Sequence, residues 1–107
     1  MFKKPRNDSR YIWTNHVFGK MIQYRLSESL IKRIIRFPSR IEEGIAENTS
    51  AAMRPTESSK KYSEIWVMYQ IDKSRLKIIT TWRYPGKSPI NNPVPANIIL
   101  EVKNLLN

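Results

Sequence analysis

The sequence predicts an α+β fold: a small antiparallel sheet packed against two N-terminal helices and a C-terminal helix. Two observations support this expectation. Two segments rich in Ile, Val, Tyr, Trp and Thr, residues 62–71 and 75–84, are separated only by "DKS" and should pair as a hairpin. Helical periodicity precedes and follows this hairpin instead of alternating with strands, which favours α+β over α/β.

The N-terminal third should hold an arm, a short strand and a helix. Residues 1–10 are polar and basic and are expected to form a flexible arm. "RYIW" has the aromatic and β-branched content of a strand. Helical periodicity begins at His16 and runs to Tyr24. It places one set of residues on an apolar face, Val17, Phe18, Met21 and Ile22, and another on a polar face, His16, Gly19, Lys20 and Gln23.

The second helix has the clearest signals. Ser27 is a good N-cap, and Glu28 suits the positive end of the helix dipole. Pro38 should end the helix at or just before Phe37. Between these limits lies an apolar stripe opposite a basic one, formed respectively by Leu30, Ile31, Ile34 and Ile35 and by Lys32, Arg33 and Arg36.

The sheet should be built from residues 40–84. Residues 40–54 are ambiguous but fit a hairpin with its turn at Glu47-Asn48, and residues 56–61 are expected to form a loop. The hairpin 62–83 should occupy the centre of the sheet. The residues expected to be buried there are Ile65, Val67, Ile71, Leu76 and Ile78.

Residues 84–95 contain four prolines and one glycine and should be extended without joining the sheet as a regular strand. A last helix follows, with an apolar face made of Ile98, Ile99, Val102, Leu105 and Leu106. We therefore divide the chain into an arm (1–10), an α+β domain (11–84), and a proline-rich extension with a C-terminal helix packed on the domain (85–107).

Charge and composition narrow the function. Nineteen Lys and Arg against nine Asp and Glu give a net charge of +10 on 107 residues, which attracts polyanions. Nucleic acid is the first expectation, with an acidic protein or an anionic membrane as competitors. With no cysteine and one histidine, neither a disulfide framework nor the usual zinc sites can form, so no metal and no cofactor are expected.

No apolar run approaches the roughly 20 residues that cross a bilayer, and the N-terminus lacks the pattern of a signal peptide. A cytoplasmic protein without a membrane partner is expected. Composition leaves its oligomeric state open.

One pattern resembles a known family. Thr14 and His16 are followed by a basic residue and a methionine, Lys20 and Met21, and then by an apolar-Ser helix start, Leu26-Ser27. This pattern, with a final strand "IITTWR", resembles a small family long catalogued only as a domain of unknown function and often compared with the BrnT and RelE toxins. The resemblance covers residues 11–84.

Two positions depart from the family. Lys20 stands where arginine is common, and it keeps the charge but lacks the planar fork that clamps phosphate. Tyr24-Arg25 stands where the family often has Arg-Gly. The resemblance implies a RelE/BrnT-like fold and an mRNA interferase-like endoribonuclease that needs no metal. It also implies a toxin–antitoxin pair in which an acidic antitoxin protein neutralises the enzyme.

Such cleavage needs a base, an acid and cations around the phosphate. His16 is the one side chain whose ordinary pKa suits proton transfer near neutral pH. Lys20 and Arg83 are the accompanying catalytic candidates, Arg83 because it follows an apolar strand. In the alternative interpretation, His16 only caps its helix or bonds a backbone carbonyl.

Further basic and aromatic residues are candidates for nucleic-acid binding. Arg54 closes a predicted strand, and Tyr84 is better placed to stack a base than Trp66, which should be core. For the helical cations, a solvated basic face is the simpler alternative. The full candidate set is Arg25, Lys32, Arg33, Arg36, Arg54 and Tyr84.

Three functions stay open on the sequence. The first is the metal-independent endoribonuclease toxin acting on RNA. The second is a non-catalytic RNA- or DNA-binding module. The third is a basic protein-interaction module for an acidic partner.

Overall fold

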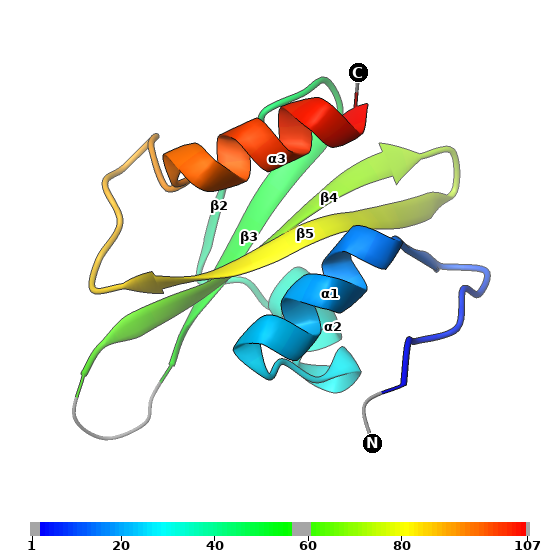
Figure 1. Ribbon diagram of the computed structural model, residues 1–107, viewed down its shortest axis with the longest axis horizontal. Coiled ribbons are helices and arrows are strands. Elements are labelled where there is room, and N and C mark those ends of the chain that lie inside the picture. The colour runs from blue at the N-terminus through cyan, green and yellow to red at the C-terminus, as the bar shows by residue number, and fades with distance from the viewer. Residues whose placement is uncertain (1–2, 57–60, 107) are drawn as a thin grey trace.

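The sheet is ordered β1-β5-β4-β3-β2, with helices on both of its faces (Figure 1). The computed structural model describes residues 3–56 and 61–106, so part of the predicted loop 56–61 lies outside the described residues. The elements run β1 (Tyr11–Trp13), α1 (Asn15–Tyr24), α2 (Glu28–Arg36), β2 (Arg40–Glu43), β3 (Thr49–Thr56), β4 (Ser63–Asp72), β5 (Arg75–Pro85) and α3 (Ala96–Leu106).

The α+β class is confirmed, but the sheet is mixed and not purely antiparallel. β1 pairs in parallel with β5, with Tyr11 opposite Leu76 and Trp13 opposite Ile78. All other neighbouring strands are antiparallel. The prediction was wrong because three residues carry no signal of strand direction. Burial of Tyr11 and Trp13 under the helices explains why this strand adds to the edge of β5.

The hairpin of β4 and β5 lies at the centre of the sheet, as predicted. Ile65, Val67 and Ile78 are buried and Leu76 is partly buried, but Ile71 is 56% exposed. Ile71 lies beyond Gln70, the last residue of β4 that pairs with β3, near the turn of the hairpin.

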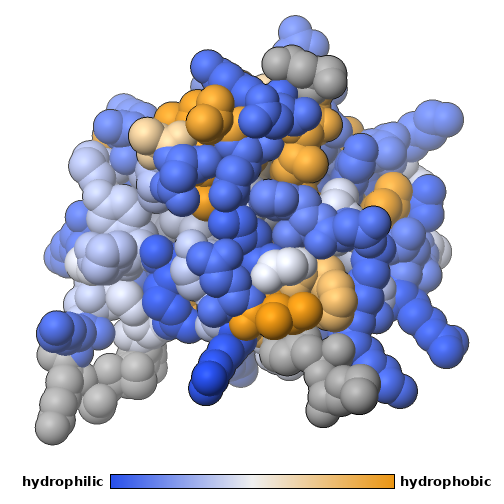
Figure 2. Space-filling model, in the orientation of Figure 1, coloured by the Kyte–Doolittle hydropathy of each residue, from blue (hydrophilic) through white to orange (hydrophobic). Residues whose placement is uncertain are grey.

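Alternation along the strands divides the core between the two faces of the sheet. One face, to which β1 contributes Tyr11 and Trp13, packs against α1 and α2. The other packs against α3, through Ile98 and Val102, and contains Trp66 stacked on Trp82 with ring centres 5.9 Å apart. Trp66 is therefore core, as predicted. In the view of Figure 2, apolar residues gather over α3, where Leu100 and Leu105 are exposed, so Leu105 of the predicted apolar face is not buried.

Side-chain and backbone caps set the helix ends. The Ser27 hydroxyl accepts the N–H of Leu30, and α2 ends before Phe37, both as predicted. α1 is capped by Thr14, whose hydroxyl accepts the N–H of Val17 at 3.1 Å. The alternative that His16 caps this helix is thus wrong, because the preceding residue with a suitable hydroxyl does so.

Polar contacts hold the segments that precede and follow the central hairpin. The Asn7 side chain accepts the N–H of Trp13 at 2.7 Å, in the segment predicted to be a flexible arm. The predicted hairpin 40–54 forms as β2 and β3. β5 continues one residue further than predicted, to Pro85, and buried Glu64 then accepts hydrogen bonds from Ser88 of the proline-rich segment.

Candidate nucleic-acid interface

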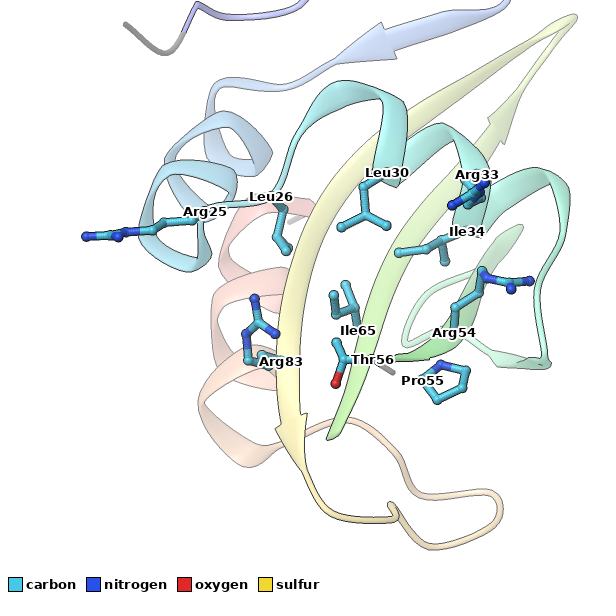
Figure 3. A pocket seen from close by; sticks show the side chains of 10 residues that line it. All are labelled: Arg25, Leu26, Leu30, Arg33, Ile34, Arg54, Pro55, Thr56, Ile65 and Arg83. Carbon is cyan, nitrogen blue, oxygen red and sulfur yellow. The ribbon is translucent and has the colours of Figure 1, made fainter. Parts of the chain in front are cut away.

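An open cleft of about 380 Å³ lies between the helical layer and one end of the sheet. Its apolar lining comes from α2, from Leu26 two residues before that helix, and from β3 and β4. Four arginines surround this lining, and we call the site the arginine cleft (Figure 3). The lining residues are Arg25, Leu26, Leu30, Arg33, Ile34, Arg54, Pro55, Thr56, Ile65 and Arg83.

The four arginines come from four separate parts of the chain. Arg33 and Arg54 lie on one side of the apolar residues, and Arg25 and Arg83 lie on the other, with the side chain of Arg25 extending away from the rest of the lining (Figure 3). Arg83 donates from Nη2 to the carbonyl of Tyr24 at 3.1 Å, and Arg54 donates from Nη1 to the carbonyl of Phe37. These bonds orient two guanidinium groups while leaving most of their donors unused.

The cleft is electropositive. None of the ion pairs between described residues involves its four arginines. No acidic side chain within residues 3–56 and 61–106 lines it either. Guanidinium groups next to an apolar surface are less screened than charges in open solvent. The arrangement therefore suits an anionic ligand, phosphate in particular, which the arginine fork can bind through two parallel hydrogen bonds.

Arg25 has an unusual backbone conformation. It follows the last residue of α1 with φ 57° and ψ 52°, in the left-handed region, and its N–H donates to the carbonyls at the end of the helix. Glycine is the usual residue at such a helix end, because it has no Cβ to clash there. Arginine at this position adds a positive charge but has a conformational cost that glycine would not have.

The structure places His16 and Lys20 apart from the lining of the arginine cleft, on the side of α1 that meets α3. The Nζ of Lys20 lies 3.0 Å from a carboxylate oxygen of Glu101, and the Nε2 of His16 lies 3.4 Å from the other. Lys20 shares the predicted polar face of α1 with His16 and Gln23, but it is only 8% exposed. Glu101 of α3 reaches this face of α1 and supplies a carboxylate partner to the buried lysine.

Burial lowers the pKa of His16 below its ordinary 6.5, and the Lys20 cation lowers it further, against the opposing effect of Glu101. The imidazole is therefore neutral at pH 7. It could accept a proton, but nothing in its immediate contacts connects it to the arginine cleft.

The other candidates are spread over the molecule. Lys32 pairs with Glu28 at 2.8 Å and lies 5.4 Å from the ring centre of Tyr11. Arg36 is exposed in the last turn of α2 and does not line the cleft. Tyr84 is half-buried against the α3 side of the sheet, on the opposite face from Arg83. Of the predicted residues, the structure thus brings together Arg25, Arg33, Arg54 and Arg83.

Sequence reasoning missed two features around these sites. Phe37 is 65% exposed and contacts Arg54 through its carbonyl. An aromatic residue before a proline gives no sign of whether it is buried. Glu64 is only 1% exposed and accepts from Trp66, Ser88 and Tyr62. Its position directly before the apolar run 65–69 was the available signal.

The described residues hold no group of three or more His, Asp or Glu side chains that could bind a metal ion. None of the helices they form is both long and apolar enough to cross a membrane. Comparisons of the chain with protein families, with curated proteins and with solved structures find no match. The relation to BrnT and RelE toxins therefore stays a prediction from the motif.

Proposed function

We propose that this protein binds RNA and that the arginine cleft holds the phosphates of its backbone. The observation that carries the proposal is the gathering of four arginines from separate segments around one cleft, without a carboxylate among the described lining. Folding brings like charges together at a cost, which a bound polyanion offsets. The net charge of +10 adds long-range attraction for the same ligand.

The conformation of Arg25 supports the proposal. A left-handed arginine costs roughly 1–2 kcal/mol relative to an unstrained residue, and glycine would avoid that cost. Arg25 also occupies the position at which the family it resembles often has glycine. A charged side chain at a strained position, on the rim of an electropositive cleft, is the combination expected of a functional residue.

The test is the salt dependence of RNA binding, measured by fluorescence anisotropy with a labelled single strand of about 12 nucleotides. The slope of log affinity against log salt should be about −0.7 for each phosphate contact. Arg83→Gln should make the slope less steep by about 0.7 and weaken binding roughly tenfold at low salt.

Arg75→Gln is the matched control. Arg75 begins the same strand, β5, and is exposed at its opposite end, roughly 27 Å from Arg83. The substitution removes the same charge and should leave the slope nearly unchanged. Equal effects of the two substitutions would reduce the binding to a general consequence of net charge and contradict the proposal.

Endoribonuclease activity is the second candidate function. The favouring observation is that two of the predicted catalytic residues meet at Tyr24. Lys20 lies 5.9 Å from its ring centre, and Arg83 donates to its carbonyl. In this mechanism a base takes the 2′-hydroxyl proton, the oxygen attacks phosphorus, and an acid protonates the departing 5′-oxygen. Neutral His16 would be the base.

Cleavage of labelled RNA in the presence of a metal chelator tests this candidate. His16→Ala should lower the rate about a hundredfold to ten-thousandfold if His16 is the base. Lys20→Ala and Arg83→Ala should lower it through lost charge stabilisation, and Lys20→Arg should retain much of it. If the protein binds RNA but never cuts it, the endoribonuclease function fails and the non-catalytic RNA-binding module remains. An acidic antitoxin that covers Lys20 and Arg83 should block cleavage. Such an antitoxin should compete with RNA for the protein in a binding assay.

A further inference from the structure

Phe37 is an exposed aromatic residue whose backbone is hydrogen-bonded to two of the residues that line the arginine cleft. It caps the end of α2, and its N–H donates to the carbonyl of Arg33 at 2.9 Å. Its carbonyl accepts from the guanidinium of Arg54. The main chain of Phe37 is thus bonded to two of the cleft arginines, to Arg33 through its backbone carbonyl and to Arg54 through its side chain.

The backbone after Phe37 is also restrained. Pro38 has a fixed φ, and the N–H of Ser39 donates to the carbonyl of Met53 in β3 at 2.7 Å. The side chain of Phe37 is nevertheless 65% exposed. Because the backbone is already restrained, stacking on the ring orders only this one side chain and no loop, which limits the entropic cost of binding.

We infer that the ligand of the arginine cleft is single-stranded and that Phe37 stacks on one of its unpaired bases. The inference rests on the proposed function and specifies its substrate class. Arg33 and Arg54 would hold phosphates next to the ring, and the π-face of Phe37 is available to any base that is not paired. In a duplex the bases are stacked on each other and cannot reach it.

Phe37→Ala tests the inference by anisotropy with a single strand and with a blunt duplex of the same sequence. We expect the variant to bind the single strand about 5- to 150-fold more weakly, the range found when a stacked aromatic residue is removed. Duplex binding should not change. Phe37→Trp should bind at least as well as the unsubstituted chain, whereas Phe37→Leu should behave like Phe37→Ala, because it keeps apolar area but loses the π-face.

Ile41→Ala is the control for loss of exposed apolar surface, because Ile41 is 58% exposed on the edge strand β2 and does not line the cleft. A fluorescent base analogue in the strand should be quenched by the protein and much less by Phe37→Ala. Thermal unfolding should show the variant to be folded.

The following results distinguish failure of the stacking inference from failure of the proposed RNA-binding function. Unchanged single-strand binding by Phe37→Ala, with weakened binding by Arg83→Gln, would overturn the stacking role and leave the arginine cleft as the RNA site. If neither substitution mattered, the proposed function itself would fail. Equal losses on single strand and duplex would also overturn the inference. A Phe37→Ala variant that binds RNA normally but no longer captures a protein partner would assign the ring to protein recognition instead.

Discussion

Lys20 of α1 and Glu101 of α3 form an ion pair 3.0 Å long between two helices that pack beside the same strand, β5. The lysine side chain is nearly buried and the glutamate is about two-thirds buried. This pair joins the helix of the N-terminal layer to the C-terminal helix, and His16 contacts the same carboxylate.

Glu101→Gln should destabilise the protein by about 1–3 kcal/mol. The value lies between the small effect of exposed pairs and the 3–5 kcal/mol seen when a fully buried pair is broken. The loss arises because the buried Lys20 cation keeps its desolvation cost without its partner. Urea unfolding measures it. Glu28→Gln is the control, because its pair with Lys32 is more exposed and should contribute about 0.5 kcal/mol or less. Equal effects would mean that the buried position of Lys20 has no energetic consequence.

Stability should depend on the ionisation of His16. Its folded-state pKa is lowered by burial and by Lys20, so its protonation favours the unfolded state. The stability linked to it is fully present above about pH 6.5 and is lost as the pH falls below that value toward the lowered folded-state pKa. His16→Asn should therefore reduce the difference in unfolding free energy between about pH 7.5 and pH 5.5. An unchanged difference would show that the imidazole is as easily protonated in the folded chain as in the unfolded one.

Glu64 should be essential for holding the proline-rich segment against the sheet, because Ser88 of that segment donates to its carboxylate. Burial raises the pKa of this carboxyl, but hydrogen bonds from Ser88, Trp66 and Tyr62 lower it more, and the net direction is down. Its contribution to stability is thus present above about pH 4.5 and lost as the pH falls through the lowered value. Glu64→Ala should cost about 3–5 kcal/mol, because it leaves buried donors without an acceptor.

Urea unfolding measures the cost of Glu64→Ala, and amide hydrogen exchange at Ser88 reports release of the segment. Glu43→Ala on β2 is the control, since this side chain is exposed and should matter by less than about 0.5 kcal/mol. Unaltered exchange at Ser88 in Glu64→Ala would mean that other contacts hold the segment.

The elements that could be predicted are those whose signals are local. α2 has a hydroxyl cap at Ser27 and a proline stop, and β4 and β5 are joined by only two residues, so their type and pairing follow from short-range rules. The parallel pairing of β1 could not be predicted, because it depends on which sheet edge the helices leave free. The burial of Lys20 depends on α3, 81 residues away.

In the candidate site, too, the residue types could be predicted from the sequence but their arrangement in space could not. Arginine is recognisable as a phosphate ligand at any position, so Arg25, Arg33, Arg54 and Arg83 were all candidates from sequence. That they surround one cleft, while His16 and Tyr84 lie elsewhere, follows from strand alternation and helix packing over the whole domain. Exposure of Phe37 is likewise a property of the tertiary structure.

Arg25 should show opposite effects on stability and on RNA binding. Arg25→Gly removes the clash of a left-handed residue, which costs roughly 1–2 kcal/mol, but glycine also gains freedom in the unfolded chain. The net expectation is a stabilisation of about 0.5–1 kcal/mol by urea unfolding. The same substitution removes a cleft cation, so the salt slope of RNA binding should become less steep by about 0.7.

Two variants separate the charge of Arg25 from its backbone conformation. Arg25→Gln keeps a side chain in the left-handed conformation, so it should weaken RNA binding as Arg25→Gly does without stabilising the fold. Lys73→Gly relieves a left-handed conformation without removing a charge from the cleft. Lys73 has φ 58° in the turn between β4 and β5, at the end of the hairpin away from Arg83, and its replacement should stabilise the protein while leaving the salt slope unchanged. Full RNA affinity in both Arg25 variants would remove Arg25 from the phosphate contacts and leave its conformation unexplained by binding.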